Sequence, residues 1–461
     1  MERDLKESKT AGYLDVLKIV WPLALGMVNH AAMQFADRAF LSRYSMSSLE
    51  AILPASTLSW IFMSFFHSIT GYSGVFVSQY HGAGDTANVY RSYRVGMMIA
   101  AVSGFLMFPL IPLGNFIFEL TAASSEILSL ETSYYAIVML GGFFVFGQMA
   151  ASAFFTGRGK TRVVFWVSLV GNLINVAIDP ILIFGRWGVP ELGMKGAAWA
   201  TVIALFLQFA TLALLAHREY RKECPRPPSY EGTLRLALRV LRFGIPAGAY
   251  EVLNMASFTT FVFVTGRVGE VVFAASNACF TINYLLYAPM AGFAIGAQTL
   301  VGHACGRGDP EGARKALVKT LHLALGFVVI ACAFVLLAYK PILSLFAPPD
   351  SSQYAEFMSA GFTLLLLMAA WMLFDSTDTV VSGALKGAGD TKFVMIWMFV
   401  ASFVIWMPVV FMVAKFHNTM PALWATMVGY VLVIMSGTLI RWRRGRWAKI
   451  SVLEPHSQKC R

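Results

Sequence analysis

Five carboxylate side chains lie within or at the edge of long apolar stretches of this chain: Asp37, Asp179, Glu251, Asp375 and Asp378. A charged group inside a membrane is energetically costly, so each one marks a candidate functional site. Such a carboxylate can exchange a proton or, with neighbouring oxygen ligands, hold a small cation. The pattern therefore indicates ion exchange.

In the first half of the chain, Asp37 shares a helix face with Gln34 and His30, which precede it by three and seven residues. We interpret Asp37 as an ion-exchanging group and the other two as auxiliary residues. An alternative leaves Asp37 at a helix end, paired with Arg38 in solvent, and His30 as a structural histidine.

A second polar group follows in the same half. Asn175 and Asp179 are four residues apart and therefore lie on one helix face. This carboxamide–carboxylate pair can hold a proton or a cation such as Na⁺. Alternatively, Asp179 only caps a kink at Pro180.

The second half carries a different set of charges. Glu251 and Asn254 lie on one predicted helix, and Asp375 and Asp378 share a face of another. We expect a substrate or cation site there. In the alternative, Asp378 only hydrogen-bonds neighbouring Ser and Thr residues.

The elements that position these residues are duplicated. Val77–Asp85 resembles Val301–Asp309, 309 − 85 = 224 residues later, and Phe155–Arg162 resembles Leu385–Lys392, 392 − 162 = 230 residues later. Trp21–Gly26 and Gly244–Gly248 open the two halves. The glycine-rich segments lack the spacing of a phosphate-binding loop, so we interpret them as tight turns.

Composition gives the fold class. The chain has 461 residues, of which 57% are hydrophobic and 13% charged, whereas soluble domains average about 25% charged residues. A membrane-spanning helix needs about 20 apolar residues. We predict an all-α integral membrane protein with twelve such helices at 14–40, 52–79, 93–118, 132–155, 163–185, 194–216, 243–265, 271–302, 317–340, 354–384, 393–415 and 421–440.

A polar connector divides these helices equally. We predict a six-helix lobe at 1–217, a cytoplasmic linker at 218–239, a second six-helix lobe at 240–450 and a cytoplasmic tail at 451–461. Six crossings per repeat make the lobes parallel, so a pseudo-two-fold axis runs along the membrane normal.

Net charge is +11, and the basic residues gather in the loops after even-numbered helices. Cytoplasmic loops are enriched in Lys and Arg, so both termini are expected in the cytoplasm. We also expect the protein to lie in the inner (plasma) membrane. In this setting the charge does not indicate nucleic-acid binding. The five cysteines have no metal or redox spacing.

Taken together, these motifs resemble the multidrug and toxic compound extrusion (MATE) family over essentially the whole chain. They include Pro22 with Asp37, "QYHGAGD" and "GRGKTR" after two helices, "NxxNxxxDPxLIFG" from Asn172, "GMKGAAWAT" from Gly193, and "GALKGAGDTK" from Gly383. Each motif alone is weakly specific, whereas the ordered set is highly specific.

The resemblance implies roles for particular residues. Asp37, Asn175 and Asp179 match a first-lobe ion site, with Thr201 as an additional ligand. In the second lobe Asp375 matches a functional aspartate. Trp371 stands where well-known members have Tyr. Asn254 stands where they have a glutamate, in the predicted helix at 243–265, and Glu251 of this chain lies one turn earlier.

The resemblance also implies a function. We expect an antiporter, not an enzyme, that exports organic, cationic drugs or metabolites in exchange for H⁺ or Na⁺ by rocker-switch alternating access. It would need no cofactor and work in the lipid bilayer as a monomer. A lipid or lipid-linked oligosaccharide flippase of the same superfamily is an alternative, and a membrane-embedded enzyme using His30, Asp37 or His67 is a remote one.

Overall fold

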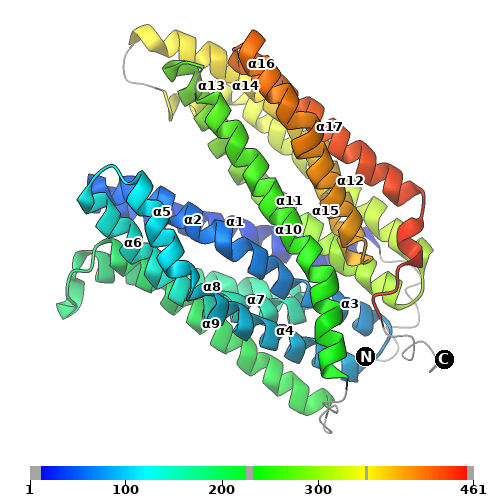
Figure 1. Cartoon of the computed structure of the whole chain (residues 1–461). Helices are drawn as coiled ribbons and strands as arrows, with labels where there is room; N and C mark the ends of the chain where they lie inside the picture. The colour runs from blue at the N-terminus through cyan, green and yellow to red at the C-terminus, as the bar shows by residue number, and fades with distance from the viewer. Residues whose placement is uncertain (1–11, 225–231, 267, 348–350, 454–461) are drawn as a thin grey trace. The chain divides into compact units, whose positions relative to one another are not determined.

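The computed structural model describes residues 12–224, 232–266, 268–347 and 351–453. All its elements are helices (Figure 1). Those of the first half are α1 Tyr13–Tyr44, α2 Met46–Gly71, α3 Ser73–Gly82, α4 Thr86–Met107, α5 Leu110–Thr121, α6 Ser125–Leu140, α7 Gly142–Gly157, α8 Thr161–Phe184, η1 Arg186–Gly188 and α9 Met194–Glu223.

The second half continues with α10 Thr233–Thr265, α11 Glu270–Gly306, α12 Pro310–Leu337, α13 Tyr339–Ser344, α14 Ser351–Gly387, α15 Thr391–Phe399, the π-helix η2 Val400–Trp406, α16 Met407–Phe416, α17 Met420–Arg443 and η3 Arg446–Lys449. Within the described residues, the predicted linker is helical at both sides, because α9 ends at Glu223 and α10 begins at Thr233. Residues 225–231 of the linker and 454–461 of the tail lie outside the described residues.

Among the described residues, nine helical segments are long and apolar enough to cross a membrane by themselves. Two bent pairs, α4 with α5 at 44° and α6 with α7 at 43°, add two more spans. The remaining predicted range, 243–265, lies in α10, which is 33 residues long. Ten of the twelve predicted ranges lie within one of these helical segments, whereas 163–185 and 317–340 run one and three residues past the ends of α8 and α12. The all-α membrane fold is confirmed.

The chain forms two compact units. The N-terminal unit contains the described residues from Leu25 to Gly248, together with 306–308 and 452–453. The C-terminal unit contains 12–24 and the remaining described residues from Ala249 to Ser451. The helices α1 and α10 each begin in one unit and continue in the other.

The two copies of the glycine–aspartate turn fold in the same way. Gly84 and Gly308 have φ values of +76° and +68°, which glycine adopts without steric cost. The carboxylates of Asp85 and Asp309 then accept the backbone N–H three residues later, at 3.0 Å and 2.8 Å, and so cap α4 and α12. The predicted tight turns are confirmed at these positions.

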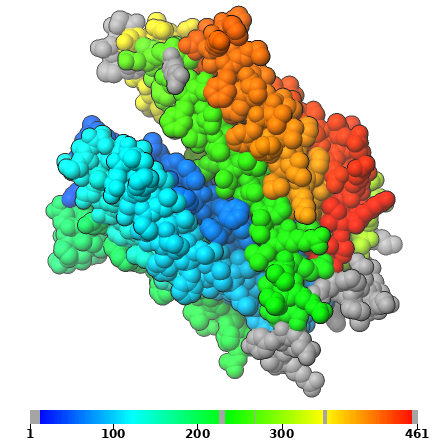
Figure 2. Space-filling view, viewed as in Figure 1, coloured from blue at the N-terminus to red at the C-terminus, as the bar shows by residue number. Residues whose placement is uncertain are grey.

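Each unit packs around its own apolar core and leaves apolar side chains on its outer face. Phe76, Phe146 and Phe154 are buried in the N-terminal unit. The outer face of α4 and α5 is visible in blue to cyan in Figure 2, and exposed side chains of these helices include Val102, Phe105, Phe116 and Leu120. An exposed apolar face of this kind suits contact with lipid.

Candidate ion and substrate sites

Asn175 joins the residues of the predicted N-terminal site. It lies on α8 with no exposed surface. With its amide oriented so that both atoms find partners, its side-chain nitrogen donates to Asp37 Oδ1 of α1 at 3.0 Å, and its side-chain oxygen accepts the backbone N–H of Thr201 of α9 at 3.2 Å. The Thr201 hydroxyl donates to Ala197 O at 3.1 Å. The structure thus brings Asp37, Asn175 and Thr201 together, and Thr201 contacts Asn175 through its backbone.

Asp179 completes this group. It lies one turn after Asn175, is completely buried, and its carboxyl group is within hydrogen-bonding reach of Asp37. Among the described residues, no N–H or O–H group donates to either of its oxygens, so Asp179 does not cap a kink at Pro180. Two ionised carboxylates can only accept hydrogen bonds. A proton shared between Asp37 and Asp179, or a cation bound by both, would therefore satisfy the pair.

Tyr134 of α6 is a neighbour that the sequence did not reveal. Its phenol interacts electrostatically with both Asp37 and Asp179. A tyrosine in an apolar helix gives no signal by itself, because the chain has 16 of them. A hydroxyl near a carboxylate pair can donate to it and help orient it.

The auxiliary residues His30 and Gln34 contact each other. His30 Nε2 lies 3.1 Å from Gln34 Nε2. The His30 side chain is exposed and that of Gln34 is half-buried. The predicted common face on α1 is therefore present as a hydrogen-bonded pair one to two turns before Asp37.

A ladder of amides continues from Asn175 through the interior of the N-terminal unit. Asn172, one turn earlier on α8, accepts a hydrogen bond from Gln208 Nε2 of α9 at 3.0 Å. Gln208 Oε1 in turn accepts from Gln148 Nε2 of α7 at 3.5 Å. Buried polar groups of this kind need partners to offset their desolvation, and here they satisfy one another.

The C-terminal unit has a related contact at the repeat positions. Gln148 corresponds to Asp378 because 378 − 148 = 230, and Gln208 corresponds to Thr438 because 438 − 208 = 230. Thr438 Oγ1 of α17 donates to Asp378 Oδ1 of α14 at 2.7 Å. Both pairs are 60 residues apart in sequence, so the duplicated helices hold a polar contact at the same place with different chemistry.

Asp378 is nearly fully buried and also accepts a hydrogen bond from Ser382 at 3.4 Å. The hydroxyl contacts that we considered as an alternative for Asp378 are therefore present. Asp375, one turn earlier and half-buried, interacts electrostatically with Asp378 and with Tyr287 of α11. These two carboxylates form one acidic patch on α14.

Glu251 of α10 lies near these carboxylates, since Tyr287 interacts electrostatically with Glu251 as well as with Asp375 and Asp378. Its Oε1 accepts a hydrogen bond from the Lys386 ammonium of α14, with Nζ at 3.1 Å. The same ammonium lies 3.7 Å from the ring centre of Tyr250. Asn254, three residues after Glu251 on α10, is half-buried. The glycine-rich pattern around Lys386 predicts a turn, whereas Lys386 lies in the last turn of α14, and its contact with Glu251 is not evident from the sequence.

Trp371 packs into the core. It is 9% exposed, and its ring lies 6.2 Å from that of Trp424 in an edge-to-face arrangement. Trp424 in turn donates to Ser276 at 3.0 Å. This environment gives Trp371 a packing contact on the side of α14 that faces α17.

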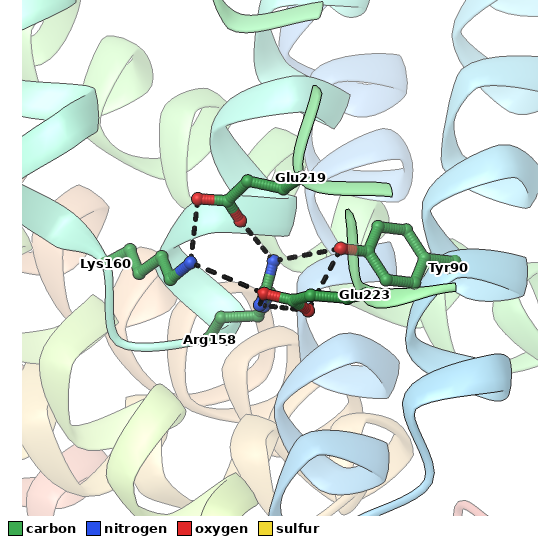
Figure 3. A network of polar contacts seen from close by, with 5 residues as sticks. All are labelled: Tyr90, Arg158, Lys160, Glu219 and Glu223. Atoms are coloured by element: carbon green, nitrogen blue, oxygen red, sulfur yellow. Dashed lines mark hydrogen bonds and ion pairs between the residues drawn. The ribbon is translucent and has the colours of Figure 1, made fainter. Parts of the chain in front are cut away.

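Two cations of the turn between α7 and α8 are neutralised within the N-terminal unit (Figure 3). Arg158 is paired with Glu219 and, at 2.7 Å, with Glu223 of α9, and Lys160 Nζ lies 2.7 Å from Glu219. Only 6% of the Arg158 side chain is exposed. Burial alone would lower the pKa of the Arg158 guanidinium, but Glu223, Tyr90 and Glu219 raise it above its usual value. The arginine therefore stays charged and fastens the turn to the last helix of its lobe.

The corresponding turn of the C-terminal unit uses the opposite charges. Asp390 stands at the repeat position of Lys160, since 390 − 160 = 230. It accepts two hydrogen bonds from Arg441 of α17, at 2.6 Å and 3.1 Å. A bidentate pair of this geometry is a strong contact, so both turns are fastened to the last helix of their lobe.

Comparison with known proteins agrees with this duplicated fold. The MatE family profile matches the chain twice, over residues 22–181 and 246–412, with starts that lie 246 − 22 = 224 residues apart. The probable multidrug resistance protein NorM of Thermotoga maritima is 24% identical over 444 residues, covering 95% of this chain and 94% of that protein. The multidrug resistance protein MdtK of Edwardsiella ictaluri is 21% identical, with 94% of each chain covered.

A solved structure shows the same fold. It is described as the outward-facing conformation of a multidrug resistance MATE family transporter of the MOP superfamily, and it aligns with a TM-score of 0.83 at 18% identity over 95% of this chain and 96% of that one. The two profile matches together span more than half of the chain. The protein is therefore a member of the MatE family, the multidrug and toxic compound extrusion transporters.

Proposed function

We propose that this transporter is a secondary active multidrug antiporter that exports organic cations in exchange for H⁺ or Na⁺ by rocker-switch alternating access. The observation that carries the proposal is the group of Asp37, Asn175 and Asp179. The two buried carboxyl oxygens of Asp179 have no donor among the described residues, so a proton or a cation bound between Asp179 and Asp37 would satisfy them. Uptake and release of that ion would supply the energy for export.

The substrate class follows from the C-terminal unit and from the relatives. Asp375, Asp378 and Glu251 offer negative charge, and carboxylates near aromatic rings favour cationic ligands. The relatives named above are multidrug resistance proteins. A flippase that holds a lipid pyrophosphate would instead need a cationic site.

Transport in proteoliposomes tests the proposal. Purified protein is reconstituted, and efflux of ethidium is followed under a proton gradient, a sodium gradient or neither. We expect efflux to depend on one of the two gradients. Ethidium efflux that is indifferent to both, with movement of a fluorescent lipid between leaflets, would support the flippase and overturn the antiporter.

We also propose that the protein lies in the inner membrane as a monomer with both termini in the cytoplasm. A single cysteine at Glu126, in the first turn of α6, should react with an impermeant maleimide added to whole cells, and one at Lys222, near the end of α9, should not. Both positions are exposed, and the five native cysteines are first replaced. The reverse labelling pattern would refute the orientation.

A further inference from the structure

Lys386 lies in a setting that suits a cationic ligand. Its ammonium is 3.1 Å from Glu251 Oε1 and 3.7 Å from the ring centre of Tyr250, and it interacts electrostatically with Asp378. An aromatic face combined with a carboxylate is the arrangement with which proteins bind alkylammonium groups. In this structure the lysine side chain occupies that arrangement.

The residues involved are confined to the second copy of the repeat. Tyr250 and Glu251 correspond to Gly26 and Met27, since 250 − 224 = 26 and 251 − 224 = 27, and Lys386 corresponds to Thr156, since 386 − 230 = 156. The lysine and its two partners therefore do not come from the duplicated framework. Their proximity in the fold is a property of the C-terminal unit alone.

The contact is also one that a ligand can open. The Glu251 side chain is 39% exposed and that of Lys386 is 15% exposed, so the pair is reachable from solvent and is weaker than a fully buried one. Lysine carries its charge on a flexible four-carbon chain with a compact head. It can swing away from Tyr250 and keep its charge hydrated.

We propose that Lys386 is a tethered competitor for organic cations: its ammonium fills the Tyr250–Glu251 site in the absence of substrate, and a cationic substrate binds there by displacing it. The lysine thereby sets the affinity of the site low enough for the substrate to be released. This inference rests on the proposed export of organic cations and names the residue that limits their binding.

The first test measures the binding of tetraphenylphosphonium, a permanent organic cation, to the purified full-length protein in lipid nanodiscs by equilibrium dialysis. We expect Lys386→Gln to bind it about tenfold more tightly than wild type, because removal of a competing cation–π contact and ion pair is worth about one factor of ten in affinity. Lys386→Arg, which retains the charge, should bind as wild type does. Lys392→Gln, at an exposed lysine six residues along the chain, controls for the change in net charge.

The outcomes separate the two proposals. If wild type and all variants fail to bind the cation, the proposed export of organic cations is wrong. If wild type binds but Lys386→Gln binds equally or more weakly, or if Lys392→Gln tightens binding as much, the role of Lys386 is refuted.

A second measurement needs no variant. Reductive methylation of wild type is quantified at Lys386 by mass spectrometry, with and without saturating tetraphenylphosphonium. Displacement predicts that the cation increases methylation of Lys386 severalfold while exposed Lys392 is unaffected. Equal or reduced methylation of Lys386 in the presence of the bound cation would contradict the proposal.

Discussion

Gly196 sets the distance between α8 and α9 beside the N-terminal ion site. A Cβ atom at this position would lie 2.6 Å from the carbonyl carbon and oxygen of Leu182 and 2.9 Å from Ile183 N, whereas ordinary contact begins near 3.4 Å. After Gly196→Ala, a shift of 3.4 − 2.6 = 0.8 Å between the two backbones would restore ordinary contact. Because the obstacle is backbone, no side-chain rotation can relieve it.

The shift would act on the ion site five residues further along α9. The bond from Thr201 N to Asn175 is 3.2 Å long, and a full 0.8 Å displacement would lengthen it beyond hydrogen-bonding range. Overpacking of this kind costs about 1–3 kcal/mol. We expect Gly196→Ala to lower the melting temperature in detergent by several degrees and to impair ion-coupled efflux of ethidium.

Gly326→Ala is the matched control, since it is a helical glycine of α12 with nothing within 4 Å of the position that a Cβ atom would take. It should leave the melting temperature unchanged or raise it, because alanine favours helix by about 1 kcal/mol over glycine. If Gly196→Ala is as stable and as active as Gly326→Ala, the close contact of α8 with α9 does not hold the ion site in place.

Three further predictions concern the charged groups. Asp37→Asn should fold normally yet abolish ion-coupled efflux, and normal coupled rates in proteoliposomes would exclude Asp37 as the coupling group. Arg158→Gln should destabilise the protein by about 1–2 kcal/mol, because Arg158 is buried while Glu219 and Glu223 are partly exposed to solvent. Adding Glu223→Gln should recover part of that loss in thermal unfolding, and a strictly additive double variant would contradict the ion-pair network. Asp375→Asn should weaken binding of a fluorescent organic cation at least tenfold, or about the effect expected for loss of one member of a charged cluster. Asp378→Asn should weaken it less, because an asparagine oxygen can still accept the hydrogen bond from Thr438. Equal binding by wild type and Asp375→Asn would show that Asp375 is not part of the substrate site.

Local chemistry explains why much of the fold was predictable. Helix positions follow from the lengths of the apolar runs, and the Gly84–Asp85 turn needs only a glycine with positive φ and a carboxylate to cap α4. Charges in apolar helices are rare, so Asp37 and Asp179 were recognisable as a pair of candidates before any contact between them was known.

The contacts that were missed depend on tertiary structure. Tyr134 approaches Asp37 and Asp179 from a different helix, and nothing in its local sequence distinguishes it from other tyrosines. Lys386 follows the pattern of a basic loop residue, but its long side chain reaches Glu251, 135 residues earlier. The chain separation of such pairs exceeds what any local pattern can encode.

The equal spacing of Gln148–Gln208 and Asp378–Thr438 has an evolutionary consequence. After a gene doubles within itself, each copy inherits the same meeting point of two helices, and point substitutions can then assign it a neutral or an acidic character. Gln148→Asp with Gln208→Thr would give the N-terminal copy the acidic pairing of its sister. Lineages built on this plan can therefore gain a second acidic centre by two amino-acid replacements, or exchange the two centres by four, while the helical scaffold stays unchanged.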